Sequence, residues 1–335
     1  FSAGQAEQAQ APLARALTLA RQHGLRAGEA RALSQLGLVD WQMGRYEAAE
    51  AQLMSALPAL QETGALRREQ DLLNNLGLVA KARGHFAKAV ACYEQAQAIC
   101  HRIGDRSGEA TLLNNMGSAW LAAGDFPRAA LKAERAARIW ASLNEPGPLG
   151  AALCNRAEAH RELGQYAAAR ATGEQALALL RASGQRRVEA TVLENLGRVA
   201  MALGEPTHAM QTLQAALALA QEIGLRAIAA STLMDIGRLH TRLGEHAAAD
   251  GALQAAARLM AELGDPMGVL EVHAARAEWL LGGNGAGATD KANALAALHE
   301  LTALLPRLLQ DQAEEAALPM SLFLVAWRAL CAAGD

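Results

Sequence analysis

The chain has 335 residues, of which 52% are hydrophobic but only 4% aromatic. This composition favours packed helices and argues against a β-sandwich, whose strands are rich in β-branched and aromatic residues. The formal net charge is −3. Such a balance provides no basic surface for nucleic acid and no attraction to acidic membranes, so we expect neither partner.

The four cysteines are Cys92, Cys100, Cys154 and Cys331, and none forms a CxxC pair. We expect buried thiols in a reducing, cytoplasmic environment, because structural disulfides belong to oxidising compartments. No apolar stretch reaches the ~18 residues of a transmembrane helix, and no signal peptide is visible. We also expect the chain to be part of a longer protein, because Phe1 is not a start methionine.

Small residues return every 40 residues, which is the strongest pattern in the sequence. The first glycine series is Gly44, Gly84, Gly124, Gly164, Gly204 and Gly244. The second is Gly37, Gly77, Gly117, Ala157, Gly197 and Gly237, and the third is Gly24, Gly64, Gly104, Asn144, Gly184, Gly224 and Gly264. Alanines keep the same step from Ala49 and from Ala56. A fixed period of this length indicates stacked structural repeats.

Each repeat is expected to contain helix A, a tight turn, helix B and a short connector. The first and third series fall at helix ends, where a left-handed stop favours glycine. The second series falls inside helix A, where glycine is costly unless another helix approaches closely. In the clearest repeat we expect helices at 107–122 and 126–143. Asp105, Ser107 and Asp125 offer the N-cap oxygens.

Six full repeats are predicted, at 25–64, 65–104, 105–144, 145–184, 185–224 and 225–264. Residues 1–24 fit a truncated helix B, since Gly4, Ala9 and Ala16 precede Gly44, Ala49 and Ala56 by one period. Residues 265–335 are predicted to form a divergent seventh repeat and a C-terminal helical cap. Its parts are a helix at about 266–281, a glycine-rich loop at 282–287, and helices at about 290–311 and 319–333.

This organisation resembles the tetratricopeptide repeat (TPR) family, in which Leu-Gly lies in helix A and an aromatic residue opens helix B. The matching residues are Leu36-Gly37, Leu76-Gly77, Met116-Gly117, Leu196-Gly197 and Ile236-Gly237, with Tyr46, Phe86, Phe126 and Tyr166; Pro206 and His246 depart from the aromatic pattern. The resemblance implies an all-α protein, a right-handed α-solenoid of TPR-like hairpins whose A helices line a concave face.

The 40-residue unit is six residues longer than the ordinary TPR. Together with Asn-Asn-Leu-Gly at 74–77 and Gly-Asp-Arg-Ser-Gly-Glu-Ala at 104–110, it is similar to the long repeats of kinesin light chains and large bacterial signalling proteins. The last twelve residues, 324–335, resemble the tail of repeat arms on bacterial regulators, and the excess of Arg over Lys fits a GC-rich bacterial genome.

The resemblance implies that the residue two before each member of the second series faces inward. These residues are Gln35, Asn75, Asn115, Asn155, Asn195 and Asp235. An asparagine offers both a donor and an acceptor, so such a row could clamp a peptide main chain. Equally, the amides could bond to the neighbouring helix and only hold the stack. Both interpretations remain open.

Further candidates on this face are Trp41, Asn74, Lys81, Asn114, Arg198 and Arg238. Arg198 and Arg238 lie one period apart and could grip a carboxylate or phosphate, or they could belong to a solvated face. Other inward positions are Arg161, Met201, Arg242 and Cys154, and the shared position of Trp120, His160 and His240 is most simply explained by packing.

Catalytic motifs are not found. The sequence has no GxxxxGK[ST] loop, GxSxG elbow or HExxH pair, and we expect no enzyme activity, cofactor or metal. The sequence therefore predicts a scaffold that binds a protein or peptide in its concave groove, within a larger bacterial regulatory protein. Two alternatives remain: a small-molecule-sensing arm of a signal-transduction ATPase, cyclase or transcription regulator, and a scaffold that self-associates through exposed terminal helices.

Overall fold

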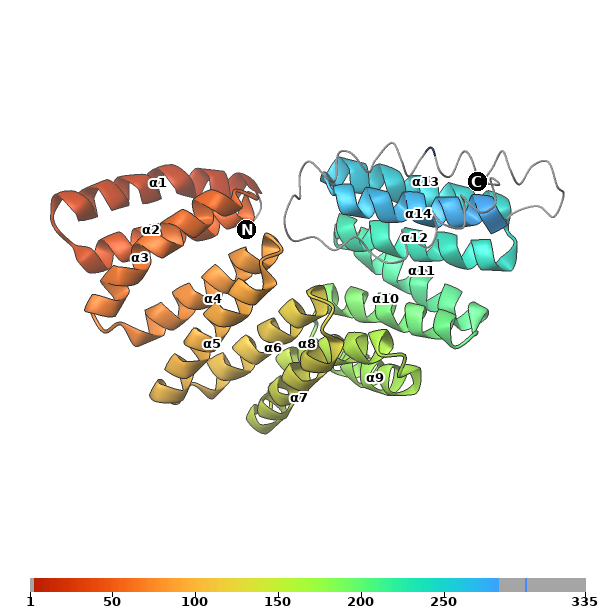
Figure 1. Ribbon diagram of the computed structural model, residues 1–335, viewed down its shortest axis with the longest axis horizontal. Coiled ribbons are helices and arrows are strands. Elements are labelled where there is room, and N and C mark those ends of the chain that lie inside the picture. Colours follow the sequence, from red (N-terminus) through yellow and green to blue (C-terminus); the bar gives the residue numbers. More distant parts are fainter. Residues whose placement is uncertain (1–2, 283–298, 300–335) are drawn as a thin grey trace. The chain divides into compact units, whose positions relative to one another are not determined.

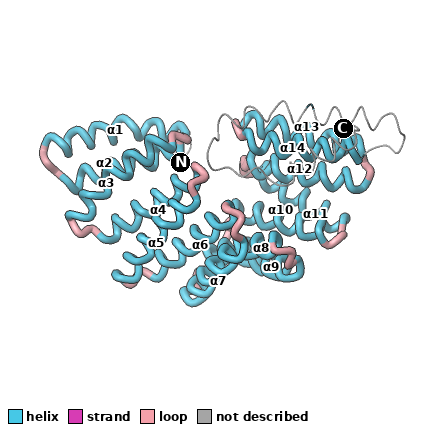
Figure 2. The backbone as a smooth tube through the Cα atoms, viewed as in Figure 1, coloured by secondary structure: helices cyan, strands magenta, loops and turns pink. Residues whose placement is uncertain are grey.

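The structure, a computed structural model, describes residues 3–282 and 299 of the chain, and it divides into two compact units, 1–163 and 164–335. The described residues form fourteen helices and no strand (Figures 1 and 2). Unit 1 contains α1 (Ala3–Gln22), α2 (Arg26–Gln42), α3 (Tyr46–Glu62), α4 (Leu66–Ala82), α5 (Phe86–Ile103), α6 (Arg106–Ala122), α7 (Phe126–Leu143) and α8 (Pro146–Glu162). Unit 2 contains α9 (Tyr166–Ala182), α10 (Arg186–Ala202), α11 (Pro206–Glu222), α12 (Arg226–Leu243), α13 (His246–Leu263) and α14 (Pro266–Gly282).

The helices end at the glycines that set the period. Gly44, Gly84 and Gly124 have φ angles of 73°, 79° and 77°, so they occupy equivalent left-handed bends. At the first bend, the Gly44 amide donates to the Trp41 carbonyl and the Arg45 amide to the Asp40 carbonyl, which satisfies two helix-end acceptors. Asn144, the one exception in the third glycine series, keeps the bend with φ 56°.

Glycines inside helix A allow helix B to pack closely. An ideal Cβ placed on Gly37 would lie 2.7 Å from Leu53 Cγ, and one on Gly77 would lie 2.3 Å from Tyr93 Cε1. The same arrangement occurs in unit 2, where a Cβ on Gly197 would lie 2.5 Å from Leu213 Cδ2. These helix B side chains are fully buried. The close approach predicted from the second glycine series is therefore confirmed at these three positions.

Within each unit, every helix packs on the next along the chain, and A helices also contact the next A helix. The A–A contacts join α2 to α4, α4 to α6 and α6 to α8 in unit 1, and α10 to α12 and α12 to α14 in unit 2. No two B helices come this close within the described part of either unit. The A helices therefore lie on the inner side of the bend in each unit, and we call the surface they present there the A-helix face.

Helices α6 and α7 begin within one residue of the predicted starts, and their caps differ in one detail from the prediction. Asp105 Oδ1 accepts a hydrogen bond from the Gly108 amide at 2.9 Å, and Asp125 Oδ1 accepts one from the Arg128 amide at 3.1 Å. Ser107 is not a cap, because α6 already begins at Arg106.

At the two ends of the array, the observed helices agree with the predicted ones only in part. The helix predicted at 266–281 is present as α14, and the lone helix B is present as α1. Gly4 lies inside the first turn of α1, so it does not mark a bend as Gly44 does. The predicted glycine-rich loop beyond Gly282, the helices at 290–311 and 319–333, and Cys331 lie outside the described residues. The division into repeats and cap remains a prediction.

Candidate ligand-binding face

In unit 1, asparagine side chains link successive A helices. Asn115 Nδ2 on α6 donates to Asn74 Oδ1 on α4 at 2.8 Å, and Asn155 Nδ2 on α8 donates to Asn114 Oδ1 on α6 at 2.9 Å. All four side chains are half-buried. We call these two linked pairs the amide ladder. The interpretation in which the asparagines hold the stack is thus realised for two of the predicted residues.

The amide ladder leaves half of its polar atoms free. The two links use the oxygens of Asn74 and Asn114 and the amide nitrogens of Asn115 and Asn155, and the Asn155 nitrogen also donates to the Asn114 main-chain carbonyl at 3.4 Å. None of the remaining side-chain atoms of these residues is buried without a partner among the described residues, so they reach solvent. The ladder therefore fixes the orientation of each amide and exposes NH2 donors on Asn74 and Asn114 and carbonyl acceptors on Asn115 and Asn155.

Asn75 begins the predicted row but takes no part in the amide ladder. Its equivalent one repeat earlier is the exposed Gln35, and the neighbouring Ser34 hydroxyl donates to the Ala30 carbonyl within α2. Asn75 is half-buried and has no side-chain hydrogen bond to another described residue. Its amide therefore offers both donors and an acceptor.

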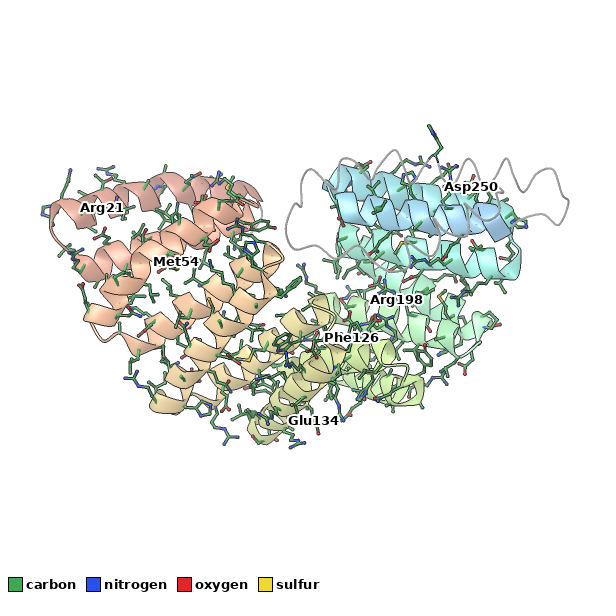
Figure 3. The ribbon with its side chains drawn as sticks, viewed as in Figure 1. Arg21, Met54, Phe126, Glu134, Arg198 and Asp250 are labelled. Atoms are coloured by element: carbon green, nitrogen blue, oxygen red, sulfur yellow. The ribbon has the colours of Figure 1, made fainter. Side chains whose placement is uncertain are left out.

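In unit 2 the same positions form an ionic network instead of an amide ladder. Arg198 on α10 donates to Asp235 Oδ2 at 2.5 Å and to Glu194 Oε1 at 2.7 Å. The Ser231 hydroxyl also donates to Glu194, and Arg238 lies 3.7 Å from Asp235. Figure 3 labels Arg198 among the side chains of this unit. Both arginines that the sequence suggested as anion receptors thus have carboxylate partners within the protein.

Two carboxylates of this network are buried. Glu194 and Asp235 are nearly inaccessible to solvent, as is the neighbouring amide of Asn195. Burial raises the pKa of the Glu271 carboxyl group on α14, and the positive charges of Arg238 and Arg198 oppose the rise. A buried carboxylate needs such a cation, so Arg198 and Arg238 stabilise the protein's own acids.

Lys81 on α4 is in a different electrostatic environment. Its ammonium donates to the Ser118 hydroxyl on α6 at 3.0 Å, and no carboxylate among the described residues forms an ion pair with it. Burial lowers the pKa of the Lys81 ammonium group. Trp41, one period earlier, packs partly against the hydrophobic core of unit 1.

The remaining inward candidates are mostly structural. Cys154 is buried, Arg161 pairs with Glu162, and Arg242 is exposed. Trp120 packs on the core of unit 1 and has the Arg128 guanidinium 4.9 Å from its ring centroid. Among residues 3–282, no group of three His, Cys, Asp or Glu side chains is placed to hold a metal ion, and no helix is long and apolar enough to span a membrane.

Sequence reasoning missed Ser118, Ser231, the buried Glu194 and the half-buried Glu271. Glu194 could have been found, because it precedes Arg198 by four residues on one helix, the spacing of a helical ion pair. Ser118 and Glu271 gave no such signal, because their partners lie on other helices.

Comparison with known proteins agrees with this architecture. Two family models, both described as tetratricopeptide repeat, match the chain, one at residues 69–142 and 148–222 and the other at 30–57. Together they cover more than half of its residues. The chain belongs to the tetratricopeptide repeat family. A search of curated proteins finds no match.

Solved structures resemble this TPR protein at low sequence identity. The apo form of the quorum sensor NprR from B. thuringiensis is 15% identical with a TM-score of 0.66, covering 92% of this chain and 84% of that one. A Rap protein complexed with Competence and Sporulation Factor is 15% identical with a TM-score of 0.61, covering 98% and 97%. A Signal Transduction ATPase with Numerous Domains from Pyrococcus horikoshii, which has a tetratricopeptide repeat sensor, is 12% identical with a TM-score of 0.56, covering 96% and 49%. These similarities establish the fold alone, and the predicted all-α solenoid is confirmed.

Proposed function

We propose that this TPR protein is a scaffold that binds an extended segment of a protein partner along the A-helix face of unit 1. The observation that supports this most directly is the amide ladder, with its oriented donors and acceptors. An extended main chain presents carbonyl acceptors and N–H donors, so it complements the free NH2 groups of Asn74 and Asn114 and the free oxygens of Asn115 and Asn155.

The geometry suggests the length of the bound segment. Packed helices lie about 8–10 Å apart, and an extended chain advances about 3.3 Å per residue. One step between A helices therefore corresponds to about three residues. A segment reaching from α4 across α6 to α8 would contain about six or seven residues. The structurally similar NprR is a quorum sensor, and the similar Rap protein is complexed with Competence and Sporulation Factor; both agree with a ligand-binding role.

The test separates binding from stacking by changing donors and acceptors individually. An aspartate at 74 and 114 keeps the oxygen that the ladder needs but loses the NH2 group offered to the ligand. We expect Asn74→Asp with Asn114→Asp to lower affinity for peptides selected from a random library by at least tenfold, since hydrogen-bond donors are replaced by negative charge. The melting temperature should change little, because both ladder links can still form.

Asn115→Asp gives the opposite result, because it removes the donor of a ladder link and places two acceptors face to face. We expect its melting temperature to fall by several degrees, equivalent to about 1–2 kcal/mol. Gln95→Ala, which removes an exposed amide from helix B α5, serves as the control for both measurements. Unchanged peptide affinity in the double aspartate variant would contradict the proposal.

A second candidate function, self-association, is favoured by the surface of α1. Leu13 is half-exposed and Ala16 is exposed, whereas their equivalents one period later, Leu53 and Ala56, are fully buried. This face would accept another helix. We expect Ala16→Glu to reduce any concentration-dependent increase in mass measured by light scattering, and an unchanged mass profile would count against this surface.

A further inference from the structure

A lysine and a serine meet between the A helices of two successive repeats in unit 1. The Lys81 Nζ atom on α4 lies 3.0 Å from the Ser118 Oγ atom on α6, and both side chains are half-buried. One repeat earlier, the same two positions hold Trp41 and Leu78, so the pair is not a consequence of the repeat itself. Its distance falls within the range of about 2.6–3.2 Å that joins a nucleophile to its general base.

The proton of the Ser118 hydroxyl is not committed to its own helix. Ser34 and Ser55 each donate to the carbonyl four residues earlier, as serines within helices commonly do. Ser118, in contrast, makes no hydrogen bond to any described residue except Lys81. Its proton can therefore pass to Lys81 when the amine is neutral.

Lys81 is suited to accept that proton. No carboxylate in the described part of the chain forms an ion pair with it, so no such partner holds the amine in its protonated form. Burial lowers the pKa of Lys81, which increases the fraction of neutral amine at a given pH. A lysine with a lowered pKa can serve as the general base of a serine–lysine pair.

The amide of Asn114 supplies a hydrogen-bond donor beside the pair. Asn114 precedes Ser118 by four residues on α6, so the two side chains lie on the same face of the helix. Its oxygen accepts from Asn155, which leaves its NH2 group free. An N–H donor next to a serine nucleophile can stabilise the negative oxygen that develops when an acyl group is attacked.

We propose that Ser118 is a nucleophile, activated by Lys81, that takes an acyl group from an activated ester. The Ser118 Oγ atom attacks the acyl carbon while its proton moves to Lys81 Nζ. When the tetrahedral intermediate collapses, the bond from carbon to the leaving oxygen breaks. The alcohol departs with that electron pair and the proton from Lys81, and Ser118 keeps the acyl group as an ester. This reactivity goes beyond the proposed binding function and does not depend on it.

The test treats the 335-residue chain with p-nitrophenyl acetate, quenches samples in acid and follows acetylation of each residue by peptide mass spectrometry. Ser34 is the internal reference, because it is a half-buried serine on α2 whose hydroxyl bonds within its helix. We expect Ser118 to be acetylated about 100-fold faster than Ser34, the lower end of what general-base catalysis contributes. The rate should rise with pH around a midpoint below the pKa of an ordinary lysine, because burial lowers the pKa of Lys81.

Four variants separate the role of a base from that of a charge. Lys81→Met removes the base, and Lys81→Arg keeps a positive charge and N–H donors but cannot accept the proton. Both should reduce the Ser118 rate to that of Ser34. Asn114→Asp keeps the oxygen that the amide ladder uses but loses the NH2 group, and it should lower the rate about tenfold. Lys132→Met, which removes a half-buried lysine from helix B α7, should leave the rate unchanged.

Three results would overturn the inference. The first is equal acetylation of Ser118 and Ser34 in the wild type. The second is acetylation of the Lys81 amine in place of Ser118, since Lys81 would then be the nucleophile and not the base. The third is a fast Ser118 reaction that survives Lys81→Arg, which would make a positive charge responsible. None of these results depends on peptide affinity, so the proposed binding function is tested separately.

Discussion

Gly77 and Gly117 occupy the same position in successive repeats, yet their surroundings differ. A Cβ on Gly77 would lie 2.3 Å from the ring of Tyr93, which is fully buried and cannot move aside. A Cβ on Gly117 would meet its nearest atom, the Ala129 carbonyl oxygen, at 3.4 Å, an ordinary contact distance. The helix B residue opposite the glycine therefore decides how much space remains.

Alanine substitutions at these two glycines should accordingly have different effects. We expect Gly77→Ala to lower the free energy of unfolding by about 1–3 kcal/mol through overpacking. Gly117→Ala should be neutral or stabilising by up to about 1 kcal/mol, because alanine is the better helix former. Urea unfolding followed by circular dichroism measures both. Equal losses in the two variants would show that the shared position, and not the opposing side chain, sets the cost.

The amino-acid sequence predicted the inward asparagines but not how they are linked. Asn75, Asn115 and Asn155 share one repeat position, yet only the latter two donate to an asparagine of the preceding A helix. The difference depends on the acceptor: Asn74 and Asn114 can accept, whereas Ser34 at the corresponding place bonds within its own helix. The ion pair of Arg198 with Asp235 was not predicted for a related reason, since Asp235 lies on the A helix of the next repeat.

Helix α6 shows how one N-cap residue fixes the start of a helix. Asp105 accepts from the Gly108 amide, and it also lies 3.5 Å from the Arg67 guanidinium and 3.4 Å from the Gln70 amide on α4. One side chain therefore both begins α6 and ties it to the preceding A helix. The sequence offered Asp105 and Ser107 as alternative caps, and only the exact first residue of the helix distinguishes them.

Removing this cap should be measurable. We expect Asp105→Ala to lower the free energy of unfolding by about 1–2 kcal/mol, from the lost N-cap and the contacts to α4. Ser107→Ala, within the first turn of the same helix, should change it by less than about 0.5 kcal/mol. Thermal and urea unfolding of the two variants make the comparison. A larger effect at Ser107 would mean that the helix begins later than Arg106, its first residue in the structure.

The 40-residue period predicted most of the helical array. A left-handed bend requires glycine or asparagine, so the bends and the helices between them follow from the sequence. The boundary between the two compact units did not follow, because the glycine series continues through Gly164 with a normal bend at φ 73°. The contrast between the two A-helix faces did not follow from the period either. Hydrogen-bonded amides occur on the face of unit 1, and ion pairs occur on the face of unit 2. This contrast depends on side chains that meet only when repeats are stacked.

The central claim is that the amide ladder presents Asn74 and Asn114 to a bound main chain while Asn115 and Asn155 hold the helices together. The most direct measurement is the nuclear magnetic resonance spectrum of the side-chain NH2 groups during titration with a peptide selected from the random library. We predict that the Asn74 and Asn114 resonances shift and become protected from hydrogen exchange, while the Asn115 and Asn155 resonances are protected from the start. Shifts confined to side chains of the B helices, with the Asn74 and Asn114 resonances unchanged, would contradict the account.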